Sequence, residues 1–104
     1  MMNLMENLPA DLESEAFDVL VDAPHVRIER IVSRGHCSAP GDWYDQDRDE
    51  WVMVVKGRAV LAFEGEAPRR MEAGDHVLVP AHARHRVEWT DPDRETIWLA
   101  VHYG

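Results

Sequence analysis

Three histidines lie close together in the stretch AGDHVLVPAHARHRVEW, residues 73–89. His76, His82 and His85 flank a short apolar run that ends at Pro80. Imidazole nitrogens are common metal ligands, and they also exchange protons near neutral pH. A metal site, a ligand pocket and the polar end of a strand are therefore three alternative explanations of this cluster.

A carboxylate that could partner these imidazoles stands at Glu50, directly before the apolar run WVMVV. If that run is a core strand, Glu50 faces the interior and needs a metal, Arg86 or a protonated neighbour, because an unpaired buried charge is costly. Every functional inference below requires Glu50 and His85 to meet inside one small β-structure.

The segments that must position these residues are short and of β type. We expect strands at residues 25–33, 85–90 and 95–103, a hairpin over residues 50–65 that turns at Lys56–Gly57, and a strand at residues 76–80 stopped by Pro80. Residues 15–21 form either a strand or a short helix, and residues 64–74 form a turn. In residues 25–33, Val26 and Ile28 face one side while Arg27 and Glu29 face the other. No stretch has a long helical period, so the sequence predicts an all-β protein.

Composition limits the function. A chain of 104 residues fits one domain, and its formal net charge of −9 disfavours nucleic acid and acidic membrane surfaces as partners. No sustained apolar stretch or signal peptide is recognisable. The single cysteine, Cys37, cannot form an intramolecular disulfide, so we expect a reducing, cytoplasmic location and an unreactive thiol.

Two glycine-anchored segments have a more specific pattern. Glu50 is followed by Gly57, and Gly74 is followed by Pro80 and His85 at fixed spacing. With the elements WYDQ, DEWV, GD, PAH and HRVEWT, the chain resembles the cupin superfamily, more narrowly its small single-domain bacterial members. The resemblance implies a double-stranded β-helix, or jelly-roll barrel, over residues 25–104, with residues 1–24 as an N-terminal extension or edge strand. One scaffold of this kind hosts many reactions.

The resemblance also implies a metal site, but this chain departs from the family pattern. Metal-binding cupins place two histidines, one residue apart, shortly before the glutamate. Those positions here hold either Tyr44 and Gln46 or Trp43 and Asp45. The ligands that the resemblance still implies are Glu50 and His85, with Gln46 or Asp45 as an oxygen donor. Such a set would hold a divalent Fe, Mn, Zn or Ni ion.

His82 is a second departure, because it stands where the family motif usually has glycine. Its ring could turn toward the barrel and join Glu50 and His85 as a third ligand. Alternatively, His82 tolerates the turn backbone and points into solvent. Both alternatives stay open from the sequence.

The sequence gives weaker evidence of a functional role for the remaining histidines and aromatic residues. We interpret His76 as structural, and His102 on the last strand as a residue that could line a pocket floor. Trp43 and Tyr44, in the polar loop, are expected to contact a ligand. Trp51 and Trp98, within apolar strands, are expected to pack in the core.

The resemblance to metal-binding cupins implies isomerisation of a small keto-acid or sugar acid, or oxygen-dependent cleavage. Tyr44 or His82 would move the proton, and an anionic substrate would need Arg86, Arg84 or Arg34. The alternative is a metal-free barrel that binds a small molecule or regulates a partner without catalysis, which the missing paired histidines favour. By analogy with cupins we also expect a homodimer.

Overall fold

The computed structural model describes residues 3–104 and contains eight β-strands and no helix in that range. The strands are β1 (Ala16–Ala23), β2 (Val26–Ser33), β3 (Asp49–Lys56), β4 (Arg58–Phe63), β5 (Arg69–Glu72), β6 (His76–Val79), β7 (His85–Thr90) and β8 (Thr96–Tyr103). The all-β prediction is confirmed, and the first segment is a strand rather than a helix. Within residues 3–104, no helix has the length and hydropathy needed to cross a bilayer.

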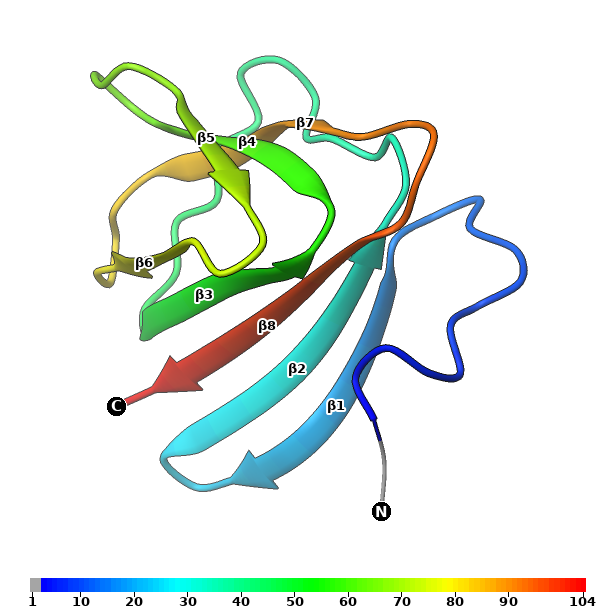
Figure 1. Ribbon diagram of the computed structural model, residues 1–104. Helices are drawn as coiled ribbons and strands as arrows, with labels where there is room; N and C mark the ends of the chain where they lie inside the picture. The colour runs from blue at the N-terminus through cyan, green and yellow to red at the C-terminus, as the bar shows by residue number, and fades with distance from the viewer. Residues whose placement is uncertain (1–2) are drawn as a thin grey trace.

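The strands form two antiparallel sheets (Figure 1). One sheet has the order β1-β2-β8-β3-β6, and the other has the order β5-β4-β7. Because β8 pairs with both β2 and β3, strands distant in the sequence become neighbours. This arrangement is the jelly-roll fold that the sequence predicts, and it brings residues from β2, β3, β7 and β8 around one interior.

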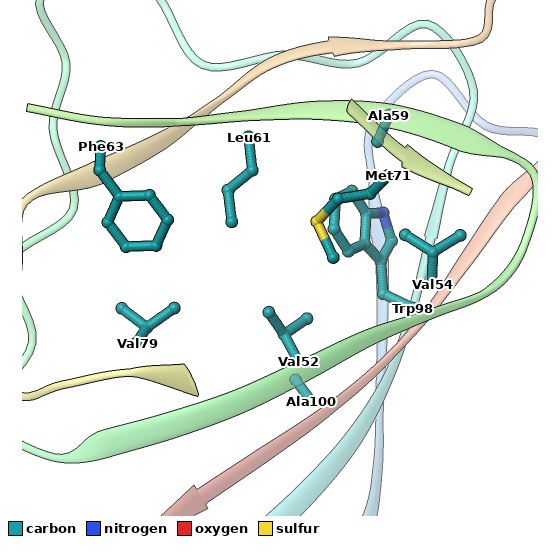
Figure 2. Close-up of a cluster of buried hydrophobic side chains, with 9 residues drawn as sticks. All are labelled: Val52, Val54, Ala59, Leu61, Phe63, Met71, Val79, Trp98 and Ala100. Carbon is teal, nitrogen blue, oxygen red and sulfur yellow. The ribbon is translucent and has the colours of Figure 1, made fainter. Parts of the chain in front are cut away.

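The core lies between the two sheets and is built from strand residues at every second position (Figure 2). On β3, Val52 and Val54 are buried while Trp51 and Met53 are only half-buried, as period-two alternation requires. The buried cluster consists of Val52, Val54, Ala59, Leu61, Phe63, Met71, Val79, Trp98 and Ala100. Trp98 is 3% exposed, so its expected core position is confirmed. The same expectation for Trp51 is wrong, because this residue is only half-buried and lies outside the buried cluster.

The turn between β3 and β4 requires glycine. Gly57 has a φ of +94°, and a Cβ there would lie 2.7 Å from the Cα of Thr96. A larger residue would therefore be strained and would also collide with the backbone of β8. The hairpin turn expected at Lys56–Gly57 is where the sequence analysis places it.

Strand β5 differs from the prediction made from the sequence. Residues 64–74 were expected to turn, but Arg69–Glu72 form β5 and pair with β4. Met71, which lies opposite Ala59, is 4% exposed and supplies the burial that holds this strand in place. A four-residue strand with one apolar residue is too short for its alternation to be visible.

The N-terminal segment contacts the outer face of β2 at one buried arginine, Arg30. The Arg30 side chain is 4% exposed and forms an ion pair with Asp18 at 2.7 Å. Its guanidinium also donates hydrogen bonds to the carbonyl oxygens of Leu4, Glu6 and Asn7, at 3.2, 2.6 and 3.2 Å. Polar contacts with the Arg30 side chain therefore hold the segment before β1 against the sheet.

Candidate functional site

A pocket of about 160 Å³ opens between the two sheets, and both sheets contribute to its wall. Most of the lining is apolar, and the polar groups are concentrated in three carboxylates, two imidazoles, one amide and one phenol. The lining residues are Glu15, Phe17, Glu29, Ile31, Tyr44, Gln46, Glu50, Val52, Leu61, His85, Val87, Trp98 and His102. A concave, mostly apolar cavity with a few converging polar groups is typical of a small-molecule site.

Glu50 from β3 and His85 from β7 meet in this pocket, as the functional inference requires. Glu50 Oε1 lies 3.7 Å from His85 Nε2, and the two residues are 7% and 5% exposed. His85 Nδ1 lies 2.8 Å from the carbonyl oxygen of Ala83. Because a carbonyl oxygen can only accept, Nδ1 carries the proton, and in the neutral ring Nε2 presents its lone pair toward Glu50.

A second carboxylate and imidazole pair lies beside the first. His102 Nε2 is 3.0 Å from Glu29 Oε1 and 3.9 Å from Glu50 Oε2. Arg27 holds the other oxygen of Glu29 at 3.2 Å. Four ionisable side chains from four strands therefore line one wall, alternating acid and base.

The pKa of His85 is raised above its ordinary value of 6.5. Burial is the largest influence and lowers the pKa, but the polar contact with Glu50, the bond to the Ala83 carbonyl and the negative charge of Glu50 together outweigh it. The charged form of His85 is thus favoured in the folded protein.

This shift predicts a pH dependence of stability in the metal-free protein. The folded state binds the His85 proton more tightly than the unfolded state, so the stabilisation is complete below about pH 6.5 and is lost as pH rises through the folded pKa. We expect the free energy of unfolding, measured with urea in the presence of a chelator, to fall across that window. The decrease should be smaller in His85→Gln. An equal decrease in both proteins would show that the raised pKa of His85 does not cause the pH dependence.

The loop before β3 presents alternate residues to the pocket. Tyr44 forms an isolated bridge with His85, in which its N–H donates to the His85 carbonyl oxygen at 2.7 Å. Tyr44 and Gln46 line the pocket, whereas Trp43 and Asp45 do not. Gln46 Oε1 is buried and has no hydrogen-bond partner in residues 3–104. Of the two alternative spacings that the sequence left open, Tyr44 and Gln46 are therefore the pair that faces the cavity.

His82 lies outside the pocket. Its φ is +65°, in the left-handed region that favours glycine, and its side chain is 67% exposed. Its Nδ1 lies 2.8 Å from Asp45 Oδ1, so the two residues pair with each other at the surface. The structure does not bring His82 to Glu50 and His85, because the backbone fits the turn while the ring points away from the barrel.

The arginines expected to bind an anionic substrate also lie outside the lining. The guanidinium of Arg86 sits 5.5 Å from the ring centroid of Trp43 and 3.7 Å from Glu88. Arg84 pairs with Glu64 at 3.0 Å. Neither Arg86 nor Trp43 contributes to the pocket wall, whereas Tyr44 does.

Comparison with known proteins assigns the fold to a family. A family model described as "Cupin domain" matches residues 31–102. The chain belongs to the cupin family. No curated protein matches this cupin in sequence.

Solved structures extend this assignment. A candidate mannose-6-phosphate isomerase from Ralstonia eutropha JMP134 is 50% identical to this cupin, with a TM-score of 0.96 over 99% of this chain and 96% of that chain. An RmlC-like cupin family protein from Methanocaldococcus jannaschii is 21% identical, with a TM-score of 0.72 over 92% and 85% of the two chains. The DMSP lyase DddQ from Ruegeria pomeroyi is 21% identical, with a TM-score of 0.76 over 100% of this chain and 55% of that one. The last two similarities concern the fold alone.

The side chains of this cupin fit a metal only if an amide takes part. Residues 3–104 hold no group of three or more His, Cys, Asp and Glu side chains that could bind a metal ion. The buried Gln46 Oε1 without a partner lies in the same pocket as Glu50 and the Nε2 of His85. One amide oxygen, one carboxylate and one imidazole form a donor set suited to a divalent transition metal.

Two pocket carboxylates were not identified from the sequence. Glu29 was assigned only to the face opposite Val26 and Ile28, and this face is the one that lines the cavity. Glu15 precedes β1 and accepts a hydrogen bond from the hydroxyl of Ser33. Nothing in the sequence distinguished Glu29 from Arg27 and Arg30, the other charged residues of the same strand, and nothing marked Glu15.

Proposed function

We propose that the pocket of this cupin holds a divalent transition metal, Fe, Mn, Zn or Ni, on Gln46, Glu50 and His85, and that it acts on a small oxygen-rich molecule. The observation that carries this proposal is the buried Gln46 Oε1, which has no hydrogen-bond partner in residues 3–104. A buried acceptor left unpaired is costly, and a cation offsets that cost directly. The position beside Glu50 and His85 is consistent with such a cation.

The charge of the pocket supports a bound cation. Glu15, Glu29 and Glu50 line it, and no lysine or arginine does among residues 3–104. Glu29 has Arg27 and His102 within 3.2 Å. The imidazole nitrogens of His85 and His102 lie farther from Glu50, at 3.7 and 3.9 Å. Glu29 and Glu50 are 6% and 7% exposed, and carboxylates this buried require compensation by positive charge.

The other pocket residues have roles that follow from their contacts. When bound, a divalent metal would polarise a carbonyl or hydroxyl oxygen of the substrate. Glu29 Oε1 lies 3.0 Å from the Nε2 of His102, so it orients this imidazole in the pocket. Tyr44 lies at the rim, 47% exposed, where its hydroxyl can donate to a ligand or move a proton.

Metal content tests this proposal. Protein purified without a polyhistidine tag should contain close to one equivalent of metal by elemental analysis, and His85→Ala should lose it. His82→Ala is the matched control, because His82 is an exposed histidine from the same segment and should retain the metal. A wild-type protein that is folded, free of metal and unable to take up Zn²⁺ or Mn²⁺ would refute the metal site.

A metal-free binding module is the second candidate, and one observation favours it. The two imidazoles already lie beside Glu50 and Glu29, at 3.7 and 3.0 Å, so each of these carboxylates has a polar neighbour without a metal. In that case the pocket would bind its ligand through the same residues, and metal analysis would find no stoichiometric ion. The elemental measurement thus separates the two candidates.

We also propose that this cupin forms a homodimer through the outer face of its larger sheet. Across this face, Leu78, Trp51, Val101, Ile28 and Val21 lie in register on five adjacent strands. All five are apolar, and Leu78 and Val21 are 51% and 43% exposed. An exposed sheet face is usually polar, so an apolar row that crosses the whole sheet is suited to a two-fold contact with a second copy.

Light scattering tests the dimer. Wild-type protein should have twice the mass of the 11.9 kDa chain, and Leu78→Asp should shift it to the monomer, because two aspartates would be buried at the contact. Phe17→Asp, on the edge strand but facing the pocket side, should leave the mass unchanged. We also propose a cytoplasmic location, which suits the exposed free thiol of Cys37.

A further inference from the structure

The polar wall of the pocket is rich in hydrogen-bond acceptors. Glu15, Glu29 and Glu50 contribute carboxylate oxygens, and ionised carboxylates can only accept. Glu50 is 7% exposed, and its nearest imidazole nitrogens lie at 3.7 and 3.9 Å, beyond hydrogen-bond distance. At least one nine-tenths buried carboxylate therefore reaches the cavity with hydrogen-bonding capacity unused.

Among residues 3–104 no arginine or lysine is placed to receive an anion in this cavity, and the imidazole of His85 already lies 3.7 Å from the carboxylate of Glu50. The guanidinium of Arg27 is engaged by Glu29, and that of Arg30 by Asp18 and the N-terminal carbonyls on the outer face. Arg86 stacks over Trp43, outside the pocket. A phosphate or carboxylate entering the pocket would meet carboxylates and no arginine or lysine among residues 3–104.

The remaining wall suits the carbon skeleton of a polyhydroxylated ligand. Tyr44 and Phe17 expose aromatic surface at the rim, at 47% and 56%, and Ile31, Val52 and Leu61 line the interior. The pocket volume is about 160 Å³, which leaves room for more than a single water molecule. A compact ligand fits this space, with hydroxyl groups directed at the carboxylates and carbon–hydrogen faces directed at the apolar side chains.

We infer that the ligand of this pocket is an uncharged polyhydroxyl compound, of the polyol or free-sugar class, and not a phosphate ester or a sugar acid. The inference rests on the proposed function in that it takes the pocket as the ligand site. Hydroxyl groups are donors and satisfy the carboxylates without bringing negative charge among them. A metal on Gln46, Glu50 and His85 would leave Glu15 and Glu29 in place to select against anions.

Matched pairs of ligands test the charge preference. Each ligand would be titrated calorimetrically into wild-type protein in the oligomeric state in which it is purified. The pairs are glycerol and glycerol 3-phosphate, glucose and either glucose 6-phosphate or gluconate, and mannose and mannose 6-phosphate. We expect at least one uncharged member to bind at least tenfold more tightly than its charged counterpart. Tighter binding of the phosphate or acid within the pairs that bind would overturn the inference.

Two variants locate the preference in the pocket. Glu29→Gln retains the shape but removes a negative charge, and it should bring the affinities of the uncharged and charged members at least threefold closer together. Glu64→Gln, an exposed carboxylate outside the pocket, should leave their ratio unchanged. An unchanged ratio in Glu29→Gln would place the selectivity elsewhere and contradict the inference.

The outcomes separate this inference from the proposed function. A protein that contains metal and binds anions but not uncharged ligands would agree with the metal site and contradict the inference about the ligand. Binding of uncharged ligands by a protein that contains no metal and takes up neither Zn²⁺ nor Mn²⁺ would support the inference and refute the metal site. Failure of every ligand in the set to bind, with and without Zn²⁺ or Mn²⁺, would overturn the inference as well as the ligand pocket.

Discussion

Glu50→Gln is expected to abolish stoichiometric metal binding while leaving the metal-free protein folded. The variant keeps the size of the side chain but replaces the central carboxylate of the pocket, which is 7% exposed, with a neutral amide. We expect the dissociation constant for Zn²⁺ or Mn²⁺ to rise by at least about 100-fold, more than the 10–100-fold typical of losing a residue that only supports a ligand. Competition with a chromogenic chelator measures this change.

The same variant has a second expected effect, on stability. At a pH above the raised pKa of His85, where a neutral His85 no longer compensates the buried charge, Glu50→Gln should stabilise the metal-free protein by about 1 kcal/mol. At pH 5, where His85 is charged, the gain should shrink or reverse, because the raised pKa of His85 depends in part on Glu50. Urea unfolding at the two pH values checks both signs. A variant that binds metal like the wild type would remove Glu50 from the proposed ligand set.

Arg30→Met is expected to be the most destabilising of the proposed substitutions. The side chain is 4% exposed, and methionine would fill much of its space but none of its hydrogen bonds. Three backbone carbonyls of the N-terminal segment and Asp18 would lose their donor. We expect the free energy of unfolding to fall by about 3 kcal/mol and Tm to fall by roughly 10–20 °C.

Arg84→Met is the matched control for this loss. Arg84 also pairs with a glutamate, Glu64, but both side chains are about half exposed, at 48% and 49%. An exposed ion pair contributes about 0–1 kcal/mol, so Tm should change by only a few degrees. Equal effects of the two substitutions would show that the N-terminal segment contributes little to stability. Increased proteolysis confined to residues 3–15 in Arg30→Met would support its role as the anchor.

Several site residues could be predicted because the family motif fixes their spacing. The relation of Gly74 and Pro80 to His85 places that histidine at the start of β7, and Gly57 fixes the end of β3 relative to Glu50. The pairing of these two side chains across the pocket, at 3.7 Å, agrees with that spacing. His82 shows the limit of such reasoning, because a position in the motif does not determine where its ring points.

By itself, the sequence determined which residues of the longer strands alternate, where the β3–β4 hairpin turns and that the chain is all β, because these depend on neighbours within a few positions. Only the tertiary structure decided which face of β2 is the interior. Period-two alternation distinguishes two faces but does not say which of them a second sheet will cover. Glu29 and His102 became a pair in the pocket because β2 and β8 lie side by side, although these residues are far apart in the chain.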